Sequence, residues 1–167
     1  LDLLVLDADV CTSTQTHLFR KAYPDRFIQA GIAEANMVGM AAGLSLMGFT
    51  PFLSTFACFV SKRMLDQIAI SIAYPRLNVK INGAYGGVST GKAGATHQSF
   101  EDLAIMRAIP DMRVLCPADG PETRSAVRLA LDTDGPVYLR TVRCEVPTLF
   151  PDPPTLAWGK GVALRSG

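Results

Sequence analysis

Short apolar runs alternate with longer stretches of mixed polarity along the whole chain. The short runs predict strands at residues 1–10, 26–29, 49–54, 77–82, 112–116 and 137–143. The longer stretches predict helices at residues 13–23, 31–48, 55–73, 101–107 and 121–131. Because strands and helices alternate, the sequence predicts an α/β fold, a doubly wound and mainly parallel sheet with helices on both faces.

The stretch from Gly31 to Gly48 contains a single charged residue, Glu34, near its amino-terminal end. Small residues such as Gly39 and Gly43 recur at helical spacing, which is typical of a helix that packs closely against another backbone. In a first helical turn, Glu34 can simply complement the helix dipole. Alternatively, a carboxylate packed among apolar residues is poorly solvated and can share a proton with a partner.

Residues 37–60 carry no charge and are numerous enough to span a bilayer. Gly48 and Pro51 interrupt this stretch, and no basic cluster flanks one of its ends. A buried helix followed by a buried strand explains it better. The sequence therefore predicts no membrane segment.

The composition limits the possible partners. A chain of 167 residues is the size of one domain. Its formal net charge of +1 gives no electrostatic reason to expect nucleic acid or an anionic membrane as a partner. The four cysteines lack CxxC spacing, which indicates reduced thiols of a cytoplasmic protein rather than disulfides or a zinc site.

The domain organisation is read from the distribution of proline. Residues 1–146 predict one domain, and the proline-rich stretch that follows predicts a linker. Residues 147–167 are therefore expected to be this linker and the start of a C-terminal domain. Because the sequence begins with neither a methionine nor a signal peptide, we expect a piece of a longer polypeptide.

A glycine-rich loop at residues 83–94 is the first candidate for chemistry, because glycine lets the backbone approach a ligand closely. Residues 86–92, GGVSTGK, nearly match a phosphate-binding P-loop. The match fails at Ala93, where a magnesium-binding Ser or Thr belongs, and this excludes a nucleotide triphosphatase. His97 follows the loop; it is either a structural histidine or a hydrogen-bonding partner of a substrate.

Charged residues near the ends of the first and last predicted strands are further candidates. Arg140 and Arg143 are either surface charges or ligands of an anionic substrate tail, for which the guanidinium fork is suited. Asp7 and Asp9 end the first strand. Since no histidine or third carboxylate accompanies this pair, the sequence predicts no metal site here.

These motifs together resemble a known family. Residues 24–59, PDRFIQAGIAEANMVGMAAGLSLMGFTPFLSTFACF, resemble the pyrimidine-binding (central) domain of the thiamine-diphosphate enzymes of the transketolase family. The resemblance continues through residues 86–123 and 135–143. The triplet Thr96-His97-Gln98 and the opening DADVCTST favour transketolase over 1-deoxyxylulose-5-phosphate synthase and the β subunits of 2-oxoacid dehydrogenases.

The resemblance implies a role for several of the candidate residues. Glu34 would hydrogen-bond N1′ of the aminopyrimidine and assist proton removal at the thiazolium C2. Phe56 and Phe59 would pack against the pyrimidine ring. Asp9 would lie near the cofactor.

Other positions are implied to hold the substrate. His97 would contact hydroxyl and carbonyl oxygens, and Ser13 and Arg143 would hold the phosphate of a sugar phosphate. The chain departs from the family at Lys62, where an aromatic residue is common, and at Lys92-Ala93, where many members have an acidic pair.

The implied reaction moves a two-carbon ketol unit from a ketose phosphate to an aldose phosphate, as in the pentose phosphate pathway. The alternatives are a 1-deoxyxylulose-5-phosphate synthase-like or 2-oxoacid dehydrogenase β-like enzyme, or a non-catalytic homologue. The family binds Mg²⁺ and the diphosphate through a Gly-Asp-Gly motif on another domain, and this sequence has no such motif. The chain is thus expected to need a diphosphate-binding domain or subunit, in a homodimer or a heterotetramer.

Overall fold

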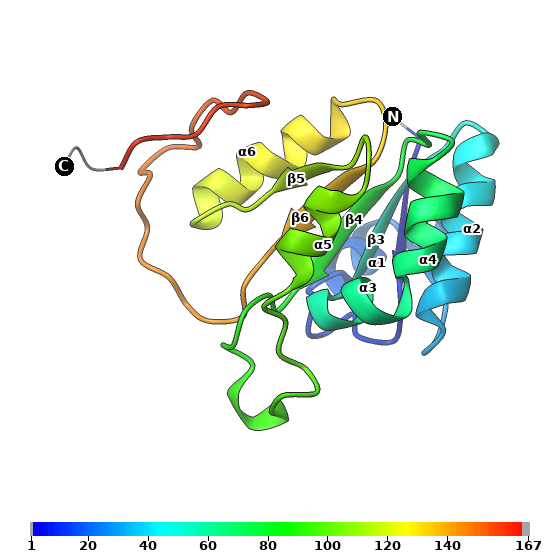
Figure 1. The fold of residues 1–167 in the computed structure, drawn as a ribbon, viewed down its shortest axis with the longest axis horizontal. Helices are drawn as coiled ribbons and strands as arrows, with labels where there is room; N and C mark the ends of the chain where they lie inside the picture. Colours follow the sequence, from blue (N-terminus) through cyan, green and yellow to red (C-terminus); the bar gives the residue numbers. More distant parts are fainter. Residues whose placement is uncertain (1, 165–167) are drawn as a thin grey trace.

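Six parallel strands form the central sheet, in the order β2-β1-β3-β4-β6-β5 (Figure 1). The structure is a computed structural model and describes residues 2–164. The strands are β1 (Leu3–Asp7), β2 (Phe27–Gln29), β3 (Thr50–Phe56), β4 (Lys80–Ala84), β5 (Arg113–Leu115) and β6 (Val137–Arg140). This topology confirms the predicted α/β fold with a parallel sheet.

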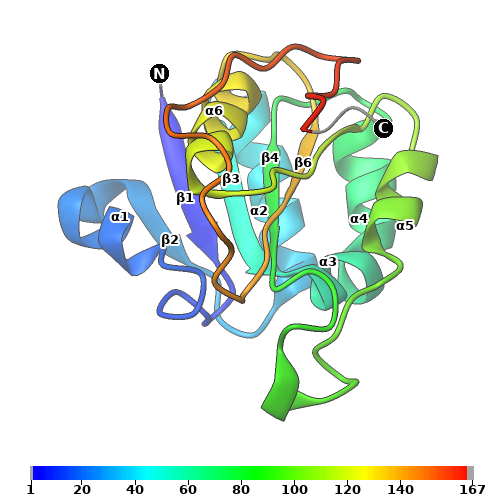
Figure 2. The same ribbon diagram turned by 90° about the vertical axis from the view of Figure 1, so that its left-hand side faces the viewer.

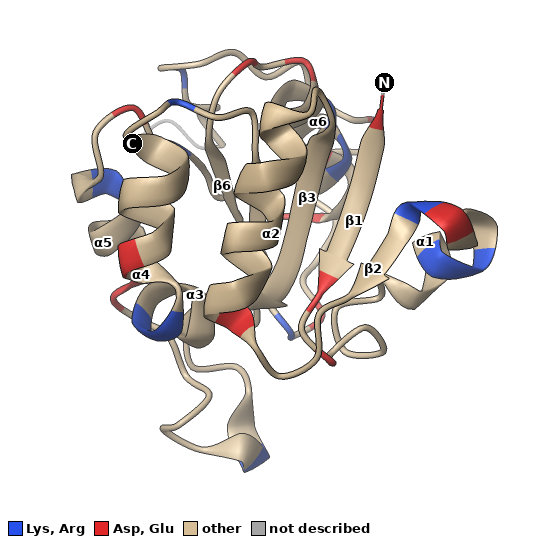
Figure 3. Ribbon diagram, turned by 90° about the vertical axis from the view of Figure 1, so that its right-hand side faces the viewer, with Lys and Arg blue, Asp and Glu red and all other residues tan. Residues whose placement is uncertain are grey.

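Helices connect the strands and cover the sheet. They are α1 (His17–Ala22), α2 (Glu34–Leu46), α3 (Ala57–Arg63), α4 (Leu65–Gln67), α5 (Asp102–Ala108) and α6 (Gly120–Leu131). Helices α2 to α5 lie on one face of the sheet, α6 lies on the other, and α1 lies beside the β2 edge (Figures 2 and 3). Between β4 and α5 the chain extends away from the rest of the molecule and includes the 3-10 turn Gly91–Ala93 (Figure 1).

The predicted single helix at residues 55–73 is wrong. Strand β3 continues through Phe56, which pairs with Ala84 of β4. Helix α3 then begins, Met64 interrupts it, and a π-helical turn runs over Ile68–Ala73. Met64, Ile68 and Ile72 are fully buried in the core. Their spacing of four residues is that of a continuous helix, so the sequence pattern did not reveal the break or the π-helical turn.

Helix α6 begins where the sequence indicates. The side chain of Asp119 accepts a hydrogen bond from Glu122 N (2.8 Å), and Glu122 Oε2 accepts one from Ala118 N (2.6 Å). Asp119 is thus the N-cap of the helix, Glu122 binds the amide of the residue before the N-cap, and Pro121 occupies the first turn.

Helix α2 divides into a buried and an open side. Met37, Val38 and Ala41 are fully buried in the core. Gly39 and Gly43 face open space, with no heavy atom within 4 Å of a Cβ placed there. The role of the side that carries Gly39 and Gly43 as an interface stays a prediction.

Within residues 2–164, no helix is long and apolar enough to cross a membrane.

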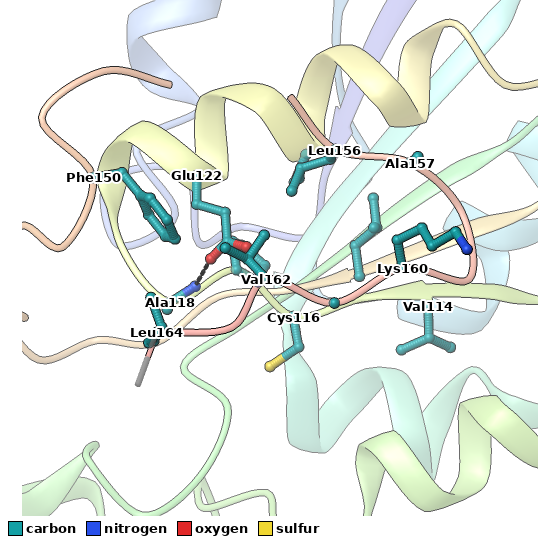
Figure 4. A pocket seen from close by; sticks show the side chains of 14 residues that line it. Val114, Cys116, Ala118, Glu122, Phe150, Leu156, Ala157, Lys160, Val162 and Leu164 are labelled. Atoms are coloured by element: carbon teal, nitrogen blue, oxygen red, sulfur yellow. Dashed lines mark hydrogen bonds between the residues drawn. The ribbon is translucent and has the colours of Figure 1, made fainter. Parts of the chain in front are cut away.

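The segment after β6 runs back over α6 and β5. The amides of Leu149 and Phe150 donate to Asp119 Oδ2 (2.7 and 2.9 Å), and Trp158 Nε1 donates to Thr133 Oγ1 (2.9 Å). A pocket of about 340 Å³ forms between this segment, the end of β5 and α6 (Figure 4). The proposed linker and C-terminal domain at residues 147–167 stay predictions, and residues 165–167 lie outside the described part.

Candidate functional site

The predicted site residues converge beyond the carboxyl ends of β1, β3, β4 and β6. A pocket of about 320 Å³ opens there; it is lined by Ser13, Phe56, Tyr85, Thr90, Lys92, Ala93, His97 and Arg143. In a parallel sheet, strand ends at the same edge are the usual place for ligand binding. The fold therefore unites four of the predicted residues: Ser13, Phe56, His97 and Arg143.

An aromatic cluster forms one side of this pocket. The rings of Phe56 and Tyr85 are stacked, with centroids 4.6 Å apart and planes inclined by 12°. Phe59 lies 5.6 Å from Phe56, and the imidazole of His97 meets Phe59 edge-on at 5.4 Å. His97 Nδ1 lies 2.9 Å from Thr96 Oγ1, which orients the ring. The cluster combines flat apolar surfaces with a hydrogen-bonding ring.

Glu34 lies at the start of α2 and is only 5% exposed. Its Oε1 atom accepts a hydrogen bond of 2.5 Å from Arg63 Nη1, at the end of α3. The guanidinium carbon of Arg63 also lies 3.8 Å from the centroid of the Phe59 ring. The buried carboxylate is therefore compensated by a cation that also connects it to the aromatic cluster.

The other lining residues of the pocket include several hydrogen-bond donors. Arg143 Nη1 donates to the carbonyl of Thr90 (2.7 Å), and its guanidinium lies 5.4 Å from the Tyr85 ring. The Thr90 hydroxyl is buried without a hydrogen-bond partner in the described part of the chain. Lys92 and Arg143 line the pocket, and none of its lining residues is acidic. This part of the pocket is suited to a ligand that carries negative charge.

Lys62 and Glu101 form an ion pair at the base of the projecting segment, with Nζ and Oε1 2.9 Å apart. The hydrogen bond from Lys62 lowers the pKa of Glu101. Lys62 stands at the position where an aromatic residue is common in the family. Because its ammonium group is paired with Glu101, it makes a structural contact there.

Glu34 and three further charged residues, Asp9, Arg140 and Asp7, lie outside the pocket lining. Asp9 is exposed, and its backbone amide donates to Gln29 Oε1 (2.8 Å). Arg140 points to Asp102, with Nε 3.2 Å from Oδ2. Asp7 is fully buried and accepts hydrogen bonds from two threonine hydroxyls and one backbone amide. Asp9 as a cofactor ligand and Arg140 as a substrate ligand stay predictions.

Tyr85 and Thr90 were missed by the sequence reasoning. Tyr85 directly follows β4 and has a positive φ of 62°, a conformation rare outside glycine that often marks functional sites. Its position between a strand and a glycine-rich loop was a usable signal. No sequence signal indicated that Thr90 would be buried.

The comparison with protein families decides the identity. The sequence model described as "Transketolase, pyrimidine binding domain" matches residues 1–148. The chain belongs to the transketolase family.

Relatives of this transketolase-family chain include proteins named as a section or a subunit of a transketolase. It is 45% identical to a putative transketolase C-terminal section of Methanocaldococcus jannaschii, over 99% of this chain and 53% of that protein. It is 41% identical to a 6-deoxy-6-sulfo-D-fructose transketolase subunit of a Clostridium species, over 99% of this chain and 51% of the relative. The chain thus spans about half the length of these relatives.

Solved structures show the same fold. A split-gene transketolase, described as an inactive β4 tetramer, superposes with a TM-score of 0.88 at 47% identity, over 99% of this chain and 53% of that one. The transketolase of Campylobacter jejuni superposes with a TM-score of 0.76 at 27% identity, over 89% of this chain and 24% of that one. The transketolase-type fold covers nearly all of this chain.

Proposed function

We propose that this chain is the pyrimidine-binding part of a thiamine-diphosphate-dependent transketolase. The enzyme moves a two-carbon ketol unit from a ketose phosphate to an aldose phosphate. The observation that carries this proposal is the buried carboxylate of Glu34, which Arg63 connects to the ring of Phe59 in the aromatic cluster, in a chain of this family.

The residues present fit an aminopyrimidine. Such a ring offers two flat faces and nitrogens that exchange a proton with a carboxylate. Glu34 supplies the carboxylate, and Arg63 engages only its Oε1 atom among the hydrogen bonds of residues 2–164. Phe56 and Phe59, whose centroids are 5.6 Å apart, supply aromatic surfaces, and Arg63 contacts both Glu34 and the Phe59 ring. The donor set and the aromatic cluster therefore match this group.

The chain's own residues have distinct tasks. Glu34 holds a proton at the pyrimidine ring nitrogen, and burial strengthens that hydrogen bond. His97 donates to oxygens of the sugar, while Ser13 and Arg143 hold its phosphate. Bound thiamine diphosphate supplies the electron sink for carbon–carbon bond cleavage.

The diphosphate and its Mg²⁺ require ligands from a partner domain or subunit. The described residues contain no cluster of three or more His, Cys, Asp or Glu side chains that could hold a metal ion. Two relatives are named as a C-terminal section and as a subunit. These facts support assembly with a diphosphate-binding subunit in a homodimer or heterotetramer, with the open side of α2 as a contact surface.

The identity of the sugars is a separate part of the proposal. Relatives of this chain are named for 6-deoxy-6-sulfo-D-fructose and for apulose 4-phosphate, so the family accepts different donors. Comparing ribose 5-phosphate as acceptor with pyruvate plus glyceraldehyde 3-phosphate separates ketol transfer from the 1-deoxyxylulose-5-phosphate synthase-like alternative.

The substitution Glu34→Gln in the assembled enzyme tests the function. We expect turnover to fall by about 10²- to 10⁴-fold with the fold retained, because the amide cannot exchange the proton. Glu145→Gln, an exposed position, is the matched control and should leave turnover unchanged. Near-normal turnover of Glu34→Gln at saturating cofactor would refute the proposal.

A further inference from the structure

The segment that carries His97 leaves the body of the protein through a narrow neck. The amide of Gly87 donates to the carbonyl of Ser99 (2.5 Å), and the amide of Ser99 donates back to Gly87 (3.0 Å). Residues 88–98, here called the glycine arm, project beyond this neck (Figure 1). Since Thr90, Lys92 and His97 reach the pocket from this arm, its orientation decides the shape of the pocket.

Two buried side chains, Asp102 and Tyr138, and the partly buried side chain of Arg140 meet at this neck. Asp102, in the first turn of α5, is fully buried. Its Oδ2 atom accepts a hydrogen bond from the hydroxyl of Tyr138 (2.8 Å) and lies 3.2 Å from Arg140 Nε. Arg140 Nη2 also donates to the carbonyl of Ser99 (3.3 Å). Arg140 therefore joins β6 to α5 and to the neck at once.

Two glycines make room for these side chains. A Cβ at Gly83 would lie 2.2 Å from the Tyr138 hydroxyl oxygen, and a Cβ at Gly86 would lie 2.2 Å from Arg140 Nε. Part of the glycine content at the end of β4 thus serves a packing purpose. The space beside Gly83 and Gly86 is filled by the side chains of Tyr138 and Arg140, whereas the sequence predicted that a ligand approaches the backbone here.

The buried ion pair is a poor source of stability. Removing two charges from water costs free energy that their attraction only partly restores, and apolar replacements of such pairs are often neutral or stabilising. Burial raises the pKa of Tyr138 far above its ordinary value, so its hydroxyl remains a neutral donor to Asp102. The better explanation for this polar cluster is that it fixes the positions of β6, α5 and the neck relative to one another.

We propose that Asp102, Tyr138 and Arg140 form a clamp that sets the angle at which the glycine arm presents His97 and Thr90 to the pocket. Arg140 is then a positioning residue and not the substrate ligand that the sequence suggested. This inference rests on the proposed function for its consequence in catalysis. A displacement of about 1 Å of a positioned group can cost about 100-fold in rate.

The test uses the whole protein assembled with its diphosphate-binding domain. Arg140→Met removes the cation, Tyr138→Phe removes only the hydroxyl, and Gly86→Ala forces Arg140 aside. Arg107→Met on the exposed side of α5 is the matched control for the first variant, and Gly120→Ala, with open space around its Cβ, is the control for the third.

Amide hydrogen exchange and kinetics are measured together. We expect exchange in residues 88–98 to rise at least tenfold in the three variants, with β3 and α2 unchanged. We expect kcat to fall by about 10- to 100-fold, with the ratio of KM values for phosphorylated and unphosphorylated donors unchanged. Neither control should show these effects.

Three results would overturn the clamp. Exchange that rises throughout the chain would make the cluster a general structural support. A higher KM for phosphorylated donors alone, with normal exchange, would make Arg140 a substrate ligand. Unchanged exchange and kcat would show that the neck is held by its backbone. If the wild-type protein transfers no ketol unit, the proposed function fails, while exchange in the arm still decides the clamp.

Discussion

Arg63 Nη1 lies 2.5 Å from Glu34 Oε1, although the two residues are 29 positions apart in the sequence. The same guanidinium lies over the Phe59 ring. The planar guanidinium of Arg63 thus contacts both a carboxylate and the face of an aromatic ring. These are the two contacts that we expect an aminopyrimidine to make. We therefore expect the proposed cofactor to compete with Arg63 for the Phe59 ring face and for Glu34, whose Oε2 atom Arg63 leaves unengaged.

The substitution Arg63→Met should therefore tighten cofactor binding. A hydrogen bond between charged groups contributes about 1.5–3 kcal/mol, and the arginine side chain is half exposed, so solvent reduces this value. We expect the Kd for thiamine diphosphate in the assembled enzyme to fall by roughly tenfold, measured by calorimetry. Arg124→Met on exposed α6 is the control. Weaker binding would show that Arg63 orients Glu34 instead.

The substitution Arg143→Ala should separate substrates by charge. Its guanidinium lines the pocket and keeps donors free beyond the bond to Thr90. Loss of a charge-assisted contact should raise the KM for phosphorylated sugars by about 10- to 100-fold, with a small change for unphosphorylated ones. Steady-state kinetics with both kinds of donor measure this. Equal effects on both would assign Arg143 a structural role.

Lys80 should make stability depend on pH in the alkaline range. The side chain is buried and donates to Asn78 Oδ1 and the carbonyls of Thr133 and Gly135. Burial lowers its pKa from 10.5 to about 8. Between these values the folded state binds fewer protons than the unfolded state, so the free energy of unfolding should rise with pH.

The size of the Lys80 effect is bounded by the pKa difference. It amounts to at most about 3 kcal/mol, and the three hydrogen bonds to the ammonium reduce it. Urea unfolding at several pH values between 8 and 10.5, compared with Lys80→Met, isolates this contribution. A slope that is the same in both proteins would contradict the prediction.

The isolated chain should bind the cofactor weakly. It offers Glu34 and the aromatic cluster to the pyrimidine, and the diphosphate needs Mg²⁺ held by oxygen ligands. We expect affinity for thiamine diphosphate with Mg²⁺ to rise by roughly 100-fold or more when the diphosphate-binding domain is added, as measured by calorimetry. Thiamine without its diphosphate is the control and should gain far less. Tight, Mg²⁺-dependent binding by the chain alone would disprove this expectation.

Local patterns in the sequence determined the type and order of most elements. Alternating apolar runs and amphipathic stretches predicted the parallel sheet. The strands of such a sheet are buried on both faces, so each one is visible in the sequence as a short apolar run. The helix predicted at residues 121–131 corresponds to α6 (Gly120–Leu131), which Asp119 caps through a local side-chain hydrogen bond. Glu34 was recognisable as a candidate since it is the only charge in its stretch.

Only the tertiary structure decided which side chains meet. Arg63 with Glu34 and Arg143 with Thr90 are contacts between elements that lie 29 and 53 positions apart. Arg140, which the sequence predicts as a substrate ligand, lies at the neck of the glycine arm, where its Nη2 donates to the carbonyl of Ser99, 41 positions away. The period of a helix or strand reports which face is buried, but it holds no information about which distant element covers that face.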